Sequence, residues 1–142
     1  MSIKGSCLCG GIRYEIDGPL GPVVNCHCSM CRKATGAAFR TRAKVLAAAF
    51  RWLQGEELLS KYDSSPGETR TFCRVCGATL PTFFREYPDE IGLALGTLDD
   101  DPGVSPSAHV WVDSKAPWYE ITDSLPQYSE GLLLVDNDPQ AG

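Results

Sequence analysis

Short stretches of alternating apolar and polar residues, separated by glycine and proline, recur along this chain. Residues 11–16, Gly-Ile-Arg-Tyr-Glu-Ile, show the alternation most clearly and predict a half-buried strand. The 14 glycines and 10 prolines are spread throughout, which favours many short strands joined by turns over long helices. Further strands are expected at residues 38–45, 50–54, 58–62, 69–72, 79–84, 91–95 and 108–112. The pattern predicts a single, mainly β domain over residues 1–142.

Two short stretches depart from the strand pattern. Residues 29–35 predict one or two helical turns, with Ser29 as the N-terminal cap and Gly36 as the stop. Residues 45–50 are also helix-like but too few to change the fold class. The end of the chain, residues 137–142, is expected to be frayed.

Charge and hydropathy narrow the classes of partner. The net charge is −5, which argues against nucleic acid, because phosphate binding needs a basic surface. No apolar run approaches the about 18 to 20 residues of a membrane span. The first residues lack the apolar segment of a secretion signal, so we expect a cytoplasmic protein. The sequence does not indicate the oligomeric state.

Positive charge is concentrated in the first half. Residues 1–75 hold eleven Lys and Arg against six Asp and Glu, whereas residues 76–142 hold two against twelve. Five of the basic residues follow one another closely: Arg32, Lys33, Arg40, Arg42 and Lys44. They form either a solvated basic face or a positive rim that attracts anionic ligands.

The seven cysteines carry the strongest chemical signal. They fall into three groups, Cys7-x-Cys9, Cys26-x-Cys28-x-x-Cys31 and Cys73-x-x-Cys76. Disulfides and a redox pair are the alternatives, but an odd number leaves one thiol over, and adjacent C-x-C pairs rarely meet disulfide geometry. Metal binding fits better, because thiolates suit zinc. Four thiolates close a tetrahedral zinc site, whereas three leave one position open.

Spacing suggests how the cysteines divide. The second group spans six residues, so one turn can place Cys26, Cys28 and Cys31 on one face of a metal. The other four, Cys7, Cys9, Cys73 and Cys76, would then share a second zinc. A partition that joins the first group to Cys26 and Cys28 stays open.

The glycines after the outer cysteine groups support the division. Gly10 and Gly77 each allow a tight turn with positive φ, which metal-binding knuckles need. A structural zinc contributes about 10 to 16 kcal/mol of apparent binding energy. Removing Cys7 or Cys73 should therefore cost the fold, whereas removing Cys28 should cost mainly the chemistry.

The two histidines are the remaining candidates. His27 could be a fourth ligand to the zinc of the second group, although it is expected to point away, because neighbouring residues of an extended turn alternate in direction. His109 is expected to share one strand face with Trp111. It is either a satisfied half-buried histidine or an acid–base or supporting group near the zinc.

The cysteine groups in their contexts, residues 5–14, 25–32 and 72–77, resemble the glutathione-dependent formaldehyde-activating enzyme (GFA) family, as do residues 50–55 and 109–118. The resemblance extends from Gly5 to about Gln127. It implies an Mss4-like β-tent of small antiparallel sheets around zinc. It also implies a structural zinc at Cys7, Cys9, Cys73 and Cys76 and a catalytic zinc at Cys26, Cys28 and Cys31.

The implied activity is condensation of glutathione with formaldehyde to S-(hydroxymethyl)glutathione, a carbon–sulfur lyase reaction with a small thiol as substrate. From their proximity to the second cysteine group in the sequence, Arg32, Arg40 or Arg42 are predicted to hold the carboxylates of the thiol, and His109 is also predicted to bind the substrate. The alternative is a non-catalytic Mss4-like zinc module that binds a protein partner. A chromatin or cytoskeletal role lacks the basic extension that it would need.

Overall fold

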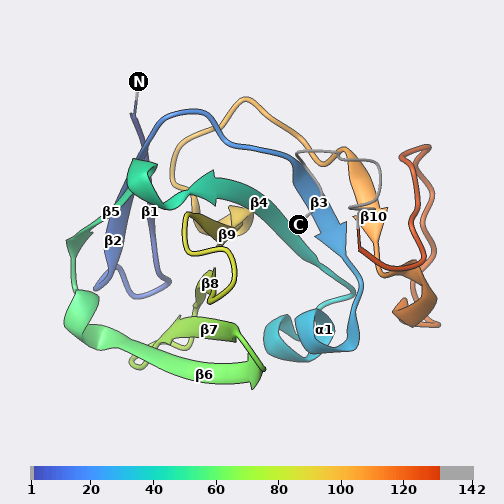
Figure 1. Cartoon of the computed structure of the whole chain (residues 1–142), viewed down its shortest axis with the longest axis horizontal. Coiled ribbons are helices and arrows are strands. Elements are labelled where there is room, and N and C mark those ends of the chain that lie inside the picture. Colours follow the sequence, from blue (N-terminus) through green and yellow to red (C-terminus); the bar gives the residue numbers. More distant parts are fainter. Residues whose placement is uncertain (1, 132–142) are drawn as a thin grey trace. The chain divides into compact units, whose positions relative to one another are not determined.

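The computed structural model describes residues 2–131, which are 42% strand and 15% helix (Figure 1). These residues form two compact units. Unit 1 comprises residues 2–20 and 43–104, and unit 2 comprises residues 21–42 and 105–131. The expectation of one domain over residues 1–142 stays a prediction, and the predicted fraying of residues 137–142 lies outside the described residues.

Unit 1 contains a three-stranded antiparallel sheet. Its strands, in spatial order, are β1 (Ser2–Ser6), β2 (Arg13–Asp17) and β5 (Phe50–Gln54). The Tyr14 ring lies across Gly5, where a Cβ atom would come within 2.2 Å of the ring. The Tyr14 hydroxyl is 2.6 Å from the Thr97 hydroxyl, and burial raises the pKa of Tyr14 to about 12. This packing holds β1 against β2, directly before the first cysteine group.

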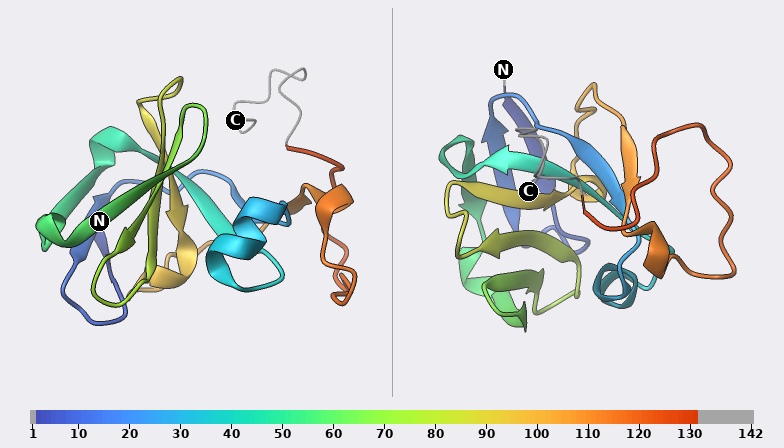
Figure 2. Two further views of the ribbon diagram at one scale, coloured as in Figure 1. Left: turned by 90° about the horizontal axis from the view of Figure 1, so that it is seen from below. Right: turned by 45° about the vertical axis from the view of Figure 1, so that its right-hand side comes forward.

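A second group of strands in unit 1 pairs antiparallel. In spatial order they are β9 (Glu90–Ala94), β8 (Thr79–Phe84), β7 (Glu68–Cys73) and β6 (Leu59–Ser65). β6 and β7 form a hairpin closed by a turn at Pro66 and Gly67 (Figures 1 and 2). Buried side chains of these strands include Leu80, Ile91 and Leu93. The hairpin and its neighbours fix the end of β7, where the third cysteine group begins.

Unit 2 is built on a parallel strand pair. β3 (Val23–Cys26) pairs with β10 (Ala108–Val110), and Cys26 lies opposite Val110. α1 (Ser29–Thr35) follows β3 after two residues, and β4 (Arg40–Leu46) then runs from unit 2 into unit 1. The core of unit 2 consists of Val24, Cys26, Cys31, Ala108 and Val110. Two of the second group's cysteines are therefore core residues as well as candidate ligands.

Short 3₁₀ turns connect several strands. They are η1 (Ala47–Ala49), η2 (Glu56–Leu58), η3 (Leu95–Thr97) and η4 (Val112–Ser114). No helix among the described residues is both long enough and apolar enough to cross a membrane.

The mainly β fold with small antiparallel sheets and one short helix is confirmed, with a parallel pair added by β3 and β10. Strands β5 and β8 begin and end where predicted. β1 was not predicted, because Ser2–Ser6 lacks apolar alternation and owes its place to pairing with β2. β2 is not half-buried as expected, since Glu15 is also buried and forms an ion pair with Arg51.

Candidate metal centres

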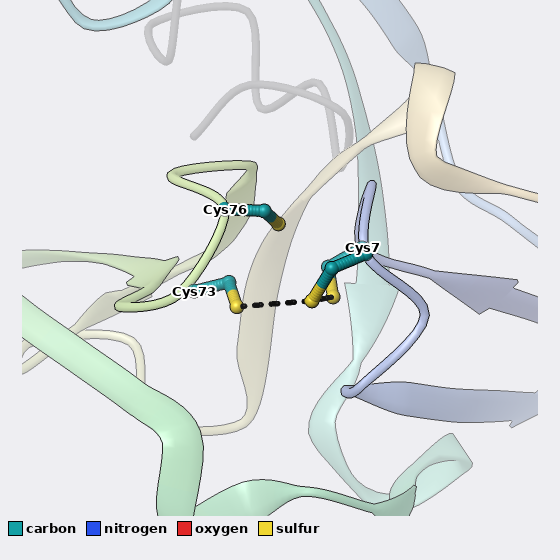
Figure 3. Close-up of side chains that lie close together, drawn as sticks. Cys7, Cys73 and Cys76 are labelled. Carbon is teal, nitrogen blue, oxygen red and sulfur yellow. Dashed lines mark hydrogen bonds between the residues drawn. The ribbon is translucent and has the colours of Figure 1, made fainter.

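The first candidate centre lies in unit 1 and is called the four-cysteine cluster: Cys7, Cys9, Cys73 and Cys76. Two of these residues follow β1 and two come from the end of β7 and the turn after it. All four sulfur atoms lie within 4.8 Å of one another. Figure 3 shows the sulfurs of Cys7, Cys73 and Cys76 directed toward a common centre. Residues more than 60 positions apart in the chain thus meet at one point.

Two matching turns present these sulfurs. The Gly10 N–H donates to the Cys7 carbonyl at 3.0 Å, and the Gly77 N–H donates to the Cys73 carbonyl at 2.7 Å. Gly10 and Gly77 both have φ of 78°, so the predicted positive-φ knuckles are confirmed. A backbone hydrogen bond from Ala78 lowers the pKa of Cys76 to about 6, which favours the thiolate form.

The sulfur spacing of the four-cysteine cluster fits a tetrahedral zinc ion. Zn–S bonds of about 2.3 Å place the sulfurs of a tetrahedron about 3.8 Å apart. The Cys7 and Cys9 sulfurs are 3.5 Å apart, and those of Cys9 and Cys73 are 3.9 Å apart. The donor set and its dimensions both suit a closed, four-thiolate metal site.

The second candidate centre lies in unit 2 and is called the three-cysteine cluster: Cys26, Cys28 and Cys31. Its sulfurs also lie within 4.8 Å of one another. Cys26 ends β3 and Cys31 belongs to α1; both are buried, whereas Cys28 is partly exposed. Among the described residues, no fourth cysteine, histidine or carboxylate joins this group. It therefore offers three protein ligands on one side of a metal.

The start of α1 shapes the three-cysteine cluster. The Cys28 sulfur accepts a hydrogen bond from the Cys31 N–H at 3.3 Å, so Cys28 is the N-cap. The prediction of Ser29 as the cap is wrong, because Ser29 is the first helical residue and the capping side chain must come from the residue before it. Gly36 does end the helix, with φ of 71°. The first turn thus aims a backbone N–H at a candidate ligand sulfur.

Electrostatics within the three-cysteine cluster favour a bound cation. Hydrogen bonding with Cys28 and then Cys31, together with burial, raises the pKa of Cys26. Three thiolates this close repel one another in a poorly hydrated place. A divalent cation among the sulfurs removes that penalty, so the donor chemistry fits a metal.

His27, between two of the three cysteines, is fully buried and directed toward another histidine. Its Nε2 is 2.8 Å from Nδ1 of His109, and its ring lies among Phe39, Tyr119 and His109. Burial lowers the pKa of His27 to about 4. His27 Nδ1 has no hydrogen-bond partner among the described residues. The ring is thus held by packing and by a single hydrogen bond.

His109 is buried and bridges His27 to Asp123. Its Nε2 lies 2.9 Å from Oδ2 of Asp123, whose side chain is 46% exposed. The hydrogen bond from His109 holds the pKa of Asp123 below its ordinary range. Asp123 was not predicted, since it lies in a polar segment without regular structure and carries no motif. The strand also ends at Val110, so His109 and Trp111 do not share a strand face; Trp111 has φ of 58°.

The three arginines predicted as substrate contacts have different environments. Arg32 donates from Nε to the Ser114 carbonyl at 3.1 Å. Arg40 is 3% exposed, so it does not belong to an exposed rim. Arg42 is partly exposed on β4. Outside unit 2, Lys44 forms an ion pair with Glu90 at 2.9 Å.

Comparison with known proteins places these cysteines in a family context. Residues 2–114 match the family model described as glutathione-dependent formaldehyde-activating enzyme. A Halomonas elongata protein provisionally named a glutathione-dependent formaldehyde-activating enzyme is 31% identical over 129 residues, which cover 85% of this chain and 82% of the relative. An uncharacterized lyase from Schizosaccharomyces pombe is 22% identical over 126 residues, covering 89% and 90%.

A solved structure is also similar. The crystal structure of a Rhodobacter sphaeroides protein matches with a TM-score of 0.60 and 28% identity, covering 73% of this chain and 92% of that one. The family match spans the segments that carry all seven cysteines. On the family match and the similarity to the Halomonas elongata relative, the chain belongs to the glutathione-dependent formaldehyde-activating enzyme family.

Proposed function

We propose that this protein is a zinc-dependent carbon–sulfur lyase that joins a small thiol, such as glutathione, to formaldehyde or a related carbonyl, as S-(hydroxymethyl)glutathione synthase does. Family membership and the lyase name of the Schizosaccharomyces pombe relative support an enzyme of this general type. The proposed cofactors are two zinc ions per chain, one in each cysteine cluster. The four-cysteine zinc would be structural and the three-cysteine zinc catalytic.

The observation that carries the proposal is the difference in ligand number. The four-cysteine cluster supplies a complete tetrahedron, whereas the three-cysteine cluster supplies three sulfurs and no fourth ligand among the described residues. A structural site has no use for an open position, but a catalytic site requires one. Zinc held there would bind the sulfur of a substrate thiol and favour its thiolate.

The reaction needs little else from the protein. The thiol sulfur forms a bond to the carbonyl carbon, and the thiol proton ends on the carbonyl oxygen. The reverse reaction breaks that C–S bond. Partly exposed Cys28 is the member of the three-cysteine cluster nearest to solvent, which supports substrate entry from its side. Arg32, Arg40, Arg42 and His109 stay predicted substrate-binding residues, and of these Arg40 and His109 are buried.

Exchange spectroscopy tests the activity. NMR exchange between formaldehyde and glutathione should accelerate with the wild-type protein and fall to the uncatalysed rate with Cys28→Ser. The matched control is Val75→Ala, an exposed position in the four-cysteine turn, which should exchange at the wild-type rate. Metal analysis should give about two zinc ions per wild-type chain and about one for Cys28→Ser.

The same measurements distinguish the catalytic proposal from the alternative of a non-catalytic zinc module. Two bound zinc ions with no acceleration of exchange would contradict the catalytic proposal and favour a module that binds a protein partner. One zinc per wild-type chain, with the three-cysteine thiols reacting freely with an alkylating reagent, would contradict the catalytic zinc itself.

We also propose a cytoplasmic location. All seven cysteines are free thiols in the structure, and both clusters need thiolates rather than disulfides. A reducing compartment maintains that state.

A further inference from the structure

A hydrogen-bonded network runs from the surface of unit 2 to the ring of His27, which lies between two cysteines of the three-cysteine cluster in the sequence. It consists of Asp123, His109 and His27 and is called the Asp–His–His network. The carboxylate is partly exposed, both imidazoles are buried, and His27 lies between Cys26 and Cys28 in the sequence. None of the three residues belongs to a cysteine cluster, and the proposed reaction has so far assigned no role to Asp123.

We propose that Asp123 is a positioning residue for the three-cysteine cluster. Through His109 it fixes the tautomer and ring orientation of His27, and with them the loop that carries Cys26 and Cys28. This inference rests on the proposed function only in taking the cluster to bind zinc.

The direction of the hydrogen bonds follows from the carboxylate, which can only accept. His109 therefore donates from Nε2 to Asp123, and in the Nε2–H tautomer its Nδ1 carries no proton and accepts. That nitrogen accepts from Nε2–H of His27, 2.8 Å away. One carboxylate at the surface thus sets the proton position on two buried rings.

Each member of the network is anchored by backbone contacts. The Leu125 N–H donates to Oδ1 of Asp123 at 3.0 Å, which orients the carboxylate. The N–H of His109 donates to the Pro126 carbonyl, and the N–H of His27 donates to the Val110 carbonyl, both at 2.9 Å. Because both the backbone and the ring of His27 are held, the sulfurs on either side of it have little freedom to separate.

The aspartate's two oxygens make one substitution informative. In Asp123→Asn, the amide oxygen should remain on the Leu125 N–H, since only an acceptor can serve there. The amide NH₂ then takes the place of Oδ2, which at 2.9 Å is nearer to Nε2 of His109 than Oδ1 is at 3.2 Å, so we expect the amide to donate to His109. Every hydrogen bond of the network reverses, and a buried N–H without a partner appears at Nδ1 of His27. The side-chain shape is unchanged.

Tautomers can be read directly, because the chain has only two histidines. Long-range ¹H–¹⁵N spectra of the zinc-loaded protein near neutral pH should show both rings protonated at Nε2. In Asp123→Asn both should change to Nδ1–H, whereas Asp123→Glu, which keeps an acceptor-only group, should retain the wild-type tautomers. Asp113→Asn, the same change at an exposed position of unit 2, should alter neither ring.

Metal affinity provides the second readout. Competition with a chromophoric zinc chelator should show zinc in the three-cysteine cluster bound about 10-fold more weakly in Asp123→Asn. Zinc in the four-cysteine cluster serves as an internal reference and should be unchanged. A wild-type ring protonated at Nδ1, tautomers unaltered in Asp123→Asn, or unaltered affinity despite altered tautomers would each overturn the proposal. Neither readout uses a thiol or carbonyl substrate, so a failure of this proposal can be distinguished from a failure of the catalytic proposal.

Discussion

The four-cysteine and three-cysteine clusters use the same chemical group in different ways. The four-cysteine cluster joins turns separated by more than 60 residues and offers four candidate ligands. The three-cysteine cluster draws on six consecutive residues at the end of β3 and the start of α1 and supplies three ligands. Under the proposed function, ligand spacing along the chain separates a zinc site that would stabilise the fold from one that would be available for chemistry.

Chain entropy explains why spacing matters. A metal that links Cys7 to Cys73 closes a long loop, and closing long loops restricts the unfolded chain most. A metal held by residues 26–31 closes almost no loop, because these residues are already neighbours. Bound metal should therefore stabilise unit 1 far more than unit 2.

Cys73→Ser should produce the largest effect. Cys73 is fully buried, and its loss opens the four-cysteine cluster, so unit 1 should lose at least about 5 kcal/mol and unfold. Urea denaturation followed by near-ultraviolet circular dichroism measures this. Cys28→Ser is the matched substitution in the three-cysteine cluster, and its denaturation midpoint should stay near that of the wild type. Equal losses in the two variants would erase the distinction between the clusters.

Gly5→Ala should have the next largest effect. A Cβ atom there would lie 2.2 Å from the Tyr14 ring, in the strand that leads to Cys7. We expect a loss of about 3 kcal/mol, because the ring is buried and has no room to move. Gly96→Ala, with nothing within 4 Å of the added carbon, is the control and should cost little. Thermal melts of the zinc-loaded proteins compare the two, and a stable Gly5→Ala would show that β1 can shift without harm to the four-cysteine cluster.

Gly77→Ala and Gly36→Ala should give the smallest effects and sharpen the comparison. Both glycines have positive φ, 78° and 71°, and an added Cβ meets nothing within 4 Å in either place. The backbone cost alone should be about 1 to 2 kcal/mol for each in the free energy of unfolding. Only Gly77→Ala lies in a knuckle of the four-cysteine cluster, so it alone should also weaken zinc binding there. Competition with a chelator measures that difference, and equal affinities would mean that the knuckle tolerates strain.

The cysteine groups could be predicted because local spacing determines them. Cys26, Cys28 and Cys31 lie within six residues, so a single turn brings their sulfurs together, and the remaining four cysteines have few other partners. The positive φ of Gly10 and Gly77 followed from their positions after cysteines. Whether these residues hold zinc, and whether they act as assigned, stays a prediction.

Features that depend on tertiary contacts could not be predicted. Asp123 meets His109 only because a segment without regular structure returns to β10. Glu15 is buried because Arg51, on a neighbouring strand, pairs with it. Ser29 was predicted as the helix cap because hydroxyl side chains commonly cap helices and thiols do not, whereas in the structure Cys28 is the cap. In each case the partner is distant or chemically unusual.

The order of residues along the chain has a consequence for synthesis on the ribosome. Unit 1 is complete once residue 104 has been added, and the last member of its four-cysteine cluster is Cys76. β10 and Asp123, which support the three-cysteine cluster, are made later. Because domains fold as units during synthesis from the N-terminus, the closed cluster gains access to metal before the support for the open one exists. A nascent chain therefore holds all seven candidate ligands once Cys76 has been added, but the residues that support the three-cysteine cluster follow only later.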